Sequence, residues 1–162
     1  MLAADVVLRP ARDGDAQDLF GLIALCFADY PGCYVDPHDD LPDLVSPAGA
    51  YGADGCGFWV IEGENGRVGA CIALDYPDPG IAELHRLYVR PDLRRRGLAA
   101  RLVDHAERHA RHHGATAMLA WSDTRFASAH RLYVRLGYSQ GAQTRELGDI
   151  SHSREYRFDK AL

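Results

Sequence analysis

Apolar and polar residues follow one another along this chain with two different periods, which predicts a mixture of strands and helices. An apolar run over 6–9 predicts an opening strand. Asp13 or Asp15 then offers an N-terminal cap for a helix, because apolar residues recur after them at spacings of three and four. Those apolar residues are Ala16, Leu19, Phe20, Leu22, Ile23 and Cys26.

A polar stretch over 30–47 interrupts the apolar pattern. It holds four prolines and a cluster of aspartates, which favour irregular backbone. We predict a long surface loop here, or a loop around one short helix near 41–45. This segment is called the flap below, and it is expected to lie on the surface.

Three apolar runs follow the flap. The runs over 57–62 and 67–74 flank the turn-rich sequence GENG, which predicts an antiparallel hairpin. A third run over 81–89 comes after a turn at 77–80 and continues the sheet. The three strands are therefore expected to form a meander.

A strand–helix–strand unit follows the meander. Apolar residues recur with helical spacing over 97–113, and Gly114 ends the run. The apolar run over 115–121 suits a buried strand. Because a helix connects the two strands, we expect 115–121 to pair in parallel with 81–89.

The last part of the chain predicts one helix and two strands. Apolar residues lie on one side of a helix over 124–136, which stops at Gly137. Strand-like stretches lie near 138–147 and 155–160. We find no internal repeat and no second domain boundary, so 1–162 is predicted to be a single domain.

The composition supports one self-sufficient domain. The 162 residues are 47% hydrophobic and 25% charged, a normal mix for one packed core. A chain of this length buries roughly 70% of its unfolded surface, so it needs neither disulfides nor a metal for stability. The alternation of strands and helices places it in the α/β (α+β) class.

Charge and cysteine usage limit the partners and the compartment. A formal net charge of -5 argues against general nucleic-acid binding. The four cysteines match neither a zinc pattern nor a compact disulfide framework, and no signal peptide or membrane-spanning run is evident. We therefore expect a cytoplasmic protein that binds neither nucleic acid nor membranes.

A basic turn between a strand and a helix is the clearest candidate for a binding site. The sequence VRPDLRRRGLA covers 89–99. The first amides of a helix lack intrahelical partners and carry partial positive charge, so they attract phosphate. Gly97 allows close backbone approach, and three arginines precede it. This pattern predicts a pyrophosphate site; a solvated cap or a weak nucleic-acid patch is the alternative.

Two motifs resemble those of the GNAT acetyltransferase superfamily. The coenzyme A loop of that family follows an Arg/Gln-x-x-Gly-x-Gly/Ala pattern, which Arg94, Gly97 and Ala99 match. The segment AHRLYVRLGY over 129–138 is similar to a second family pattern, Ala-x-x-Leu-Tyr-x-x-x-Gly-Phe. The resemblance extends to the order of predicted elements over essentially the whole chain.

The resemblance implies a fold and a co-substrate. The fold would be the GNAT acyl-CoA N-acyltransferase fold, a mixed, mostly antiparallel sheet of about seven strands flanked by about four helices. Acetyl-CoA would be the co-substrate, without a metal; backbone at 87–89 would pair with its pantetheine arm, and amides from 95–100 would hold its pyrophosphate. The implied binding residues are Leu87, Tyr88, Val89, Arg94, Arg95, Arg96, Gly97, Leu98, Ala99 and Ala100.

The resemblance also implies two catalytic residues. Tyr133 occupies the position of a general acid that protonates the departing thiolate, although a core tyrosine is the alternative. Glu83 occupies the position of a carboxylate that takes a proton from the amine; a solvated residue on a sheet edge is the alternative. His85 points to the same face as Glu83 and titrates near neutral pH, so it could share or replace that role.

One position departs from the family pattern. The family commonly has Asn seven residues before Tyr133, where this chain has Phe126, whose ring cannot supply that hydrogen bond. Asp123, Thr124 or Ser128 could substitute for it, and Phe126 alternatively packs in the core. We expect Asp123 to cap the helix that follows it, with a substrate contact as the second interpretation.

These residues lead to one expected function and an alternative. The chain is predicted to be an N-acetyltransferase, an acyltransferase that moves the acetyl group of acetyl-CoA directly to a primary amine. The acceptor is a small-molecule or peptide amine that the sequence does not identify. The alternative is a catalytically idle acyl-CoA binding or regulatory module. A homodimer is a further expectation, because dimers are frequent in this superfamily.

Overall fold

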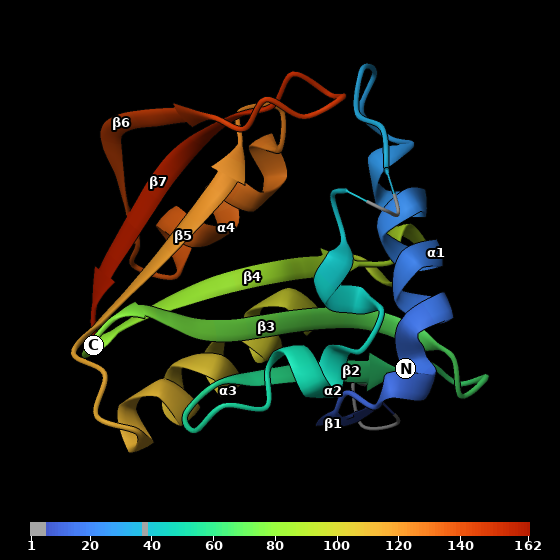
Figure 1. The fold of residues 1–162 in the computed structure, drawn as a ribbon, viewed down its shortest axis with the longest axis horizontal. Helices are drawn as coiled ribbons and strands as arrows, with labels where there is room; N and C mark the ends of the chain where they lie inside the picture. The colour runs from blue at the N-terminus through green and yellow to red at the C-terminus, as the bar shows by residue number, and fades with distance from the viewer. Residues whose placement is uncertain (1–5, 37–38) are drawn as a thin grey trace.

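The structure is a computed structural model that describes residues 6–36 and 39–162 (Figure 1). Within these residues, seven strands form one sheet in the order β1-β2-β3-β4-β5-β7-β6. Only β4 and β5 pair in parallel, and the remaining neighbours are antiparallel. The strands are β1 Val7–Pro10, β2 Gly57–Glu62, β3 Val68–Asp78, β4 Ile81–Val89, β5 Ala117–Asp123, β6 Ser139–Glu146 and β7 Arg154–Ala161.

Helices cover both faces of the sheet (Figure 1). α3 and α4 pack on one face, and α1 packs on the other. No helix among the described residues is both long and apolar enough to cross a membrane. The helical elements are α1 Ala16–Phe27, α2 Pro47–Ala50, α3 Leu98–His112 and α4 Ala127–Arg135, with 3₁₀ turns η2 Asp13–Asp15, η3 Pro42–Leu44 and η4 Pro91–Leu93.

The predicted class and order of elements are confirmed. The strand predicted over 115–121 pairs in parallel with 81–89, as expected. β3 continues beyond the predicted end at 74, because polar residues there still pair with β4; Asp75 lies opposite Glu83. In the flap, the predicted short helix is η3, and α2 is a further element that the pattern did not predict.

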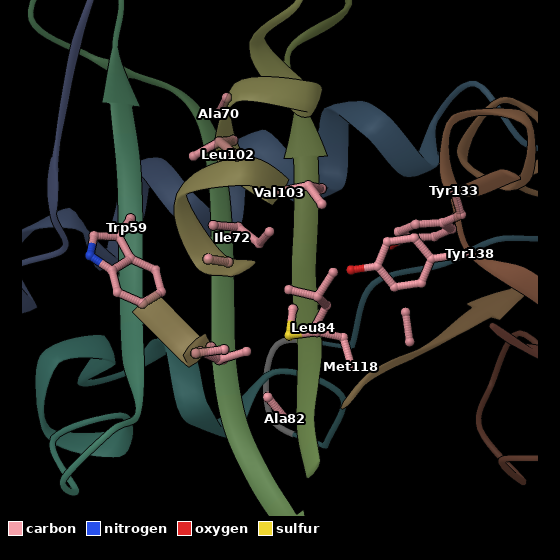
Figure 2. Close-up of a cluster of buried hydrophobic side chains, with 14 of the residues drawn as sticks. Trp59, Ala70, Ile72, Ala82, Leu84, Leu102, Val103, Met118, Tyr133 and Tyr138 are labelled. Atoms are coloured by element: carbon pink, nitrogen blue, oxygen red, sulfur yellow. The ribbon is translucent and has the colours of Figure 1, made fainter. Parts of the chain in front are cut away.

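Side chains of β3 alternate between two hydrophobic cores. Ile72 and Leu74 belong to the core on the α3 face, where they pack with residues such as Leu102 (Figure 2). Cys71 and Ala73 belong to the core on the α1 face. All five are fully buried, and burying each large aliphatic side chain contributes roughly 1.5–3 kcal/mol. The central strands are therefore fixed from both faces.

The contact between β4 and β5 ends partway along both strands. Cα pairing extends from Ile81 opposite Ala117 to Leu84 opposite Ala120. Beyond this point β4 stays paired with β3 and β5 stays paired with β7, while the two strands diverge (Figure 1). The sheet is thus split into two halves at the carboxyl-terminal ends of β4 and β5. Within the described residues, the edge of β4 that faces β5 has no strand partner there.

The prediction that an aspartate side chain caps α1 is wrong. Asp15 occupies the N-cap position of α1, but its side chain makes no hydrogen bond to that helix. Its carboxylate instead accepts two hydrogen bonds from Arg9, at 2.8 and 2.9 Å, and one from the Arg12 amide at 2.7 Å. The reason is the half-buried Arg9 of β1, which needs a counter-charge more than the exposed helix end does.

A buried ion pair links α3 to the far half of the sheet. Glu107 of α3 is 5% exposed. Its carboxylate accepts hydrogen bonds from Lys160 of β7, at 2.9 Å for each oxygen, and from the Tyr138 hydroxyl at 3.0 Å. That hydroxyl points into the core between the two halves (Figure 2). The contact therefore spans the division between β4 and β5.

We predict that Lys160→Met destabilises the protein by roughly 2–4 kcal/mol, because the buried Glu107 carboxylate loses its nearest cation and keeps only Arg111, at 3.5 Å. The double variant Glu107→Gln with Lys160→Met should recover part of that loss, since the charge is then removed as well. Urea unfolding of both variants measures the difference. Equal destabilisation in the single and double variants would contradict this account.

Candidate functional site

A cavity of about 280 Å³ lies where β4 and β5 diverge. We call it the strand cavity. It is lined by both predicted catalytic residues, Glu83 of β4 and Tyr133 of α4, and by Leu87 and Tyr88 from the predicted pantetheine strand. The structure thus brings Tyr133 of α4 to the same hollow as three residues of β4 that lie far from it in the sequence.

A second cavity of about 310 Å³ adjoins the first. We call it the flap cavity, because it lies between the flap and the loop over 147–153 that joins β6 to β7. The two cavities have several lining residues in common, among them Asp40, Arg86 and Phe126. They therefore form one continuous hollow that extends from Glu83 and Tyr133 to the flap.

A β-bulge in β4 shapes the wall between the two cavities. Cys71 of β3 lies opposite Tyr88, but Ala73 lies opposite His85, so β4 carries one extra residue between these positions. Arg86 at the bulge has φ 55, and its carbonyl accepts a 3.0 Å hydrogen bond from the Cys71 thiol. The bulge turns β4 away from regular pairing at the height of the cavity.

The Arg86 side chain ties this bulge to the flap. Its guanidinium donates to both oxygens of Asp43, at 2.7 and 3.1 Å, and to the Asp40 carbonyl at 3.1 Å. The Tyr51 hydroxyl donates to the same Asp43 carboxylate at 2.7 Å. Burial opposes ionisation of Asp43, but the hydrogen bond and charge of Arg86 together with the Tyr51 hydroxyl outweigh it and lower the Asp43 pKa.

Glu83 is part of a hydrogen-bonded group with His85 and Asp75. It is 9% exposed and lies on a central strand, so the alternative of a solvated edge residue is wrong. His85 Nε2 lies 2.8 Å from Asp75 Oδ1 and 3.4 Å from Glu83 Oε2. Burial acts to lower the pKa of His85, but hydrogen bonds to Asp75 and Glu83 outweigh burial and raise it to about 9.

This group has the spacing of a metal site as well. Ligand atoms of Asp75, Glu83 and His85 all lie within 4.8 Å of one another. A protonated imidazole offers no lone pair to a metal ion, whereas it satisfies both carboxylates by hydrogen bonding. The ion pairs of His85 with Asp75 and Glu83 thus explain why these three side chains lie close together. The expectation of no metal stays a prediction.

Tyr133 is a buried residue whose hydroxyl faces the strand cavity. The residue is 5% exposed, and its ring packs against Tyr138 and Phe158 at centroid distances of 5.5 and 5.2 Å. Its hydroxyl has no hydrogen-bond partner among the described residues. Burial raises the Tyr133 pKa well above its ordinary value, so the phenol keeps its proton at neutral pH.

The basic turn after β4 presents a run of free amides. The first helical hydrogen bond of α3 runs from Arg101 N to Gly97 O at 3.0 Å. The amides over 95–100 have no acceptor within the described part of the chain. Arg95 and Gly97 have φ of 62 and 75, left-handed values that curve the backbone into an anion-binding nest. This geometry supports the predicted phosphate site.

The three arginines of the turn differ in their contacts. Arg94 donates to the Val89 carbonyl at 3.2 Å and pairs with Asp29 at 2.9 Å, so it joins the turn to the end of α1. Arg95 and Arg96 are exposed and have no carboxylate partner among the residues described here. The positive charge available to an anion therefore comes from Arg95 and Arg96, while Arg94 holds the turn in place.

Phe126 and Asp123 correct or refine the sequence prediction. Phe126 packs against Tyr30 and Phe27, at centroid distances of 4.8 and 5.8 Å, and lines both cavities. Asp123 does not cap α4; its carboxylate binds the Arg125 guanidinium at 2.7 and 2.9 Å and the Arg125 amide at 2.8 Å. The turn that this contact stabilises delays the start of α4 to residue 127.

Sequence reasoning missed two charged residues of the site. Asp75 lies directly opposite Glu83. The predicted strand ended at 74; had it been extended by one residue, its pairing with the next strand would have placed Asp75 beside Glu83. No feature of the sequence indicated a role for Arg86. Neither the β-bulge at this residue nor its ion pair with Asp43 of the flap corresponds to a local sequence pattern. Both residues act by holding other residues of the cavity wall.

Comparisons with known proteins agree with this geometry. The family described as "Acetyltransferase (GNAT) family" matches residues 20–138, more than half of the chain. The chain is 34% identical to human N-acetyltransferase 8 over 91 residues, which are 54% of this chain and 40% of that protein. The chain thus spans well under half the length of the curated relatives it matches.

Solved structures of similar fold cover nearly the whole chain. An acetyltransferase from Streptococcus agalactiae superposes with a TM-score of 0.81 at 20% identity and covers 98% of this chain and 99% of its own. The yncA protein of Salmonella typhimurium, determined with its cofactor acetyl-CoA, superposes with a TM-score of 0.75 at 20% identity and covers 97% and 94%. At this identity the likeness establishes the fold.

We predict that His85 makes stability depend on pH in the alkaline range. Its folded pKa of about 9 exceeds the ordinary 6.5, so its stabilising effect is complete below the ordinary pKa and is lost as pH rises through about 9. His85→Gln should therefore cost roughly 1–2 kcal/mol at about pH 6 and much less at about pH 10.

Urea unfolding at both pH values measures this effect. His112→Gln is the matched control, because His112 is exposed on α3 and has no carboxylate partner among the described residues. A His85→Gln cost that is the same at both pH values would contradict the ion-paired arrangement.

Proposed function

Since the chain belongs to the acetyltransferase (GNAT) family, we propose that it transfers the acetyl group of acetyl-CoA to a primary amine. The single observation that carries this proposal is the position of Glu83 and Tyr133. A buried carboxylate and a buried phenol line one cavity. The wall of this cavity follows β4 from Glu83 to Tyr88, and the strand then leads into the free amides of 95–100. Proton removal, proton donation and phosphate binding are thus arranged along one path.

The amides over 95–100 fit the pyrophosphate of acetyl-CoA. Six successive donors curve around one point, and a helix start adds partial positive charge. No heavy atom lies within 4 Å of a Cβ built on Gly97, so the space beside this residue is open for a ligand. The guanidinium groups of Arg95 and Arg96 supply further positive charge at the same turn.

The free edge of β4 fits the pantetheine arm. Beyond Leu84 this edge has lost its pairing with β5, so peptide groups at 87–88 are available to an amide-containing ligand, whereas the Val89 carbonyl already accepts from Arg94 and Cys26. Phe126 stands at the family's usual Asn position, so pantetheine contacts from that side are apolar. The thioester supplies an activated acetyl group, and binding along this edge would bring it to the strand cavity.

The residues of the strand cavity are suited to direct transfer. Glu83 takes a proton from the attacking nitrogen as the C–N bond forms and the C–S bond breaks. Tyr133 donates its hydroxyl proton to the departing sulfur, so that free thiol leaves, and the phenolate regains a proton from solvent. Glu83 returns its proton to solvent. No covalent bond to the protein is needed, and positioning supplies much of the rate.

His85 acts beside Glu83 and is not the base in this proposal. An imidazole with a pKa of about 9 holds a proton at neutral pH and has no free lone pair to accept another. Its Nε2 lies 3.4 Å from Glu83 Oε2, so His85 contacts the proposed base and helps to hold it in place. Asp75 holds His85 in this orientation.

The idle binding module gains no support from the structure. Phe126 suggested it, but Phe126 packs with Phe27 and Tyr30 beside the cavity and leaves Glu83 and Tyr133 facing the hollow. A module that had lost its acceptor site would not need a buried carboxylate and an unpartnered phenol at one place. The enzyme reading therefore stands as the proposal.

We predict that Gly97→Val raises the dissociation constant of acetyl-CoA by about tenfold or more, that is, by at least ~1.4 kcal/mol. A branched side chain disfavours the left-handed backbone and fills the space that the pyrophosphate would use. Gly114→Val is the matched control, because Gly114 has φ 83 and the same open surroundings at the other end of α3. Isothermal titration distinguishes them, and equal affinities would contradict the assignment.

We predict that Glu83→Gln and Tyr133→Phe each lower kcat by roughly a hundredfold or more, because each removes one proton transfer. Both variants should keep the dissociation constant of acetyl-CoA within about twofold of the parent protein, since neither removes a phosphate or peptide contact. Release of free thiol across a panel of amines measures kcat. A Tyr133→Phe variant with the parent kcat would remove Tyr133 from the mechanism.

A further inference from the structure

The walls of the two cavities carry more negative than positive charge. Six carboxylates line them, against two arginines and one histidine. The carboxylates are those of Asp39, Asp40, Glu83, Asp123, Asp149 and Glu155. A charged molecule in this hollow therefore meets an electrostatic field that favours cations.

Each cation of the walls is already paired with a carboxylate, and so is the Arg125 guanidinium that binds Asp123. The separations between paired atoms are 2.7 or 2.8 Å. The pairs are Arg86 with Asp43, Arg125 with Asp123, Arg145 with Glu155 and His85 with Asp75. An incoming carboxylate or phosphate on the acceptor would have to displace one of these partners.

Three carboxylates of the flap cavity have no such partner. Asp39, Asp40 and Asp149 form no ion pair with any cation among the described residues. Asp40 accepts a hydrogen bond from the Asp36 amide at 3.0 Å, and Asp149 accepts two from Ser153 at 2.6 and 2.7 Å. The carboxylates of Asp40 and Asp149 are oriented by these neutral donors, and Asp149 also interacts at longer range with Arg125, which is bound to Asp123.

A contact between two loops lies beside the flap cavity, which Ser151 lines. The Tyr34 amide donates to the Ser151 hydroxyl at 2.7 Å, and that hydroxyl donates to the Tyr34 carbonyl at 3.1 Å. The loop over 147–153 reaches the end of the flap in this way (Figure 1). The small volume of the flap cavity, about 310 Å³, favours a molecule of small cross-section.

The strand cavity also contains a group that awaits a partner. Tyr133 is 5% exposed, lines the cavity and has a hydroxyl without a hydrogen-bond partner among the described residues. Because this hydroxyl is accessible from the cavity, a ligand there can form a hydrogen bond with it. The acidic flap cavity is therefore continuous with the strand cavity, where the Tyr133 hydroxyl is available to a ligand.

From these observations we propose that the acceptor is a slender aliphatic amine with a second ammonium group, such as an unbranched diamine. This inference rests on the proposed acetyl transfer. The reacting nitrogen lies beside Glu83 and Tyr133, and the second ammonium lies in the flap cavity near Asp40 and Asp149. One amine becomes an acetamide as free thiol is released, while the second ammonium keeps its proton and its charge.

The test compares three acceptors that differ at the end remote from the reacting amine. Putrescine carries an ammonium there, butylamine a methyl group and γ-aminobutyrate a carboxylate. We expect kcat/KM for putrescine to exceed that for butylamine by about tenfold, because the remote charge adds binding in the flap cavity. The value for γ-aminobutyrate should be lower than both. Equal values for putrescine and butylamine, or a preference for γ-aminobutyrate, would overturn the inference.

A pair of charge-removing variants locates the effect. Asp40→Asn keeps a side-chain oxygen for the Asp36 amide and removes only the charge, so KM for putrescine should rise by about fivefold while KM for butylamine stays unchanged. Asp54→Asn removes the same charge from an exposed loop residue outside both cavities and should change neither. An equal rise for both amines in Asp40→Asn would contradict the assigned position.

A binding measurement separates this inference from the proposed function. Titration of putrescine and butylamine into the protein loaded with coenzyme A reports charge preference without turnover. Tighter binding of putrescine that weakens in Asp40→Asn supports the diamine assignment even where no acetyl transfer occurs, in which case only the proposed function fails. Equal binding of the two amines overturns the diamine assignment and leaves acetyl transfer to another amine intact.

Discussion

The loss of hydrogen bonding between β4 and β5 beyond Leu84 is the constraint on which the site depends. Parallel strands normally stay paired, and each unpaired peptide group needs another partner. Here both strands keep their outer neighbours, so the sheet remains one body while its centre divides. The division creates the strand cavity, exposes one edge of β4 and directs the chain into the basic turn.

Ion pairs fix the side chains around this division. Asp75 and Glu83 both contact His85 Nε2, and Asp43 holds Arg86 at the bulge. These contacts connect β3, β4 and the flap, and they leave the Glu83 carboxylate at the surface of the cavity. The proposed chemistry therefore relies on charges that are ordered before any reactant binds, which reduces the reorganisation that a reaction would require.

Local pattern predicted much of this structure, and tertiary contacts account for the rest. Apolar period and glycine stops are local, so the order of strands, the parallel pair and the basic turn followed from the sequence. Asp15 and Asp123 were expected to cap helices, but each forms an ion pair with an arginine instead. The fold brings Arg9 to Asp15, and a tight turn brings Arg125 to Asp123. Arg86 and Asp43 are separated by the whole β2–β3 hairpin, and no periodicity connects them.

The buried contact of Glu107 with Lys160 and Tyr138 has a mechanical consequence. It joins α3, which continues from the basic turn, to β7 and to the end of α4 on the other side of the division. Widening the wedge between the two halves would pull a carboxylate away from its ammonium inside the core, which is costly. The separation between the two halves of the sheet is therefore nearly fixed, and a reactant has to fit the cavity as the strands already shape it.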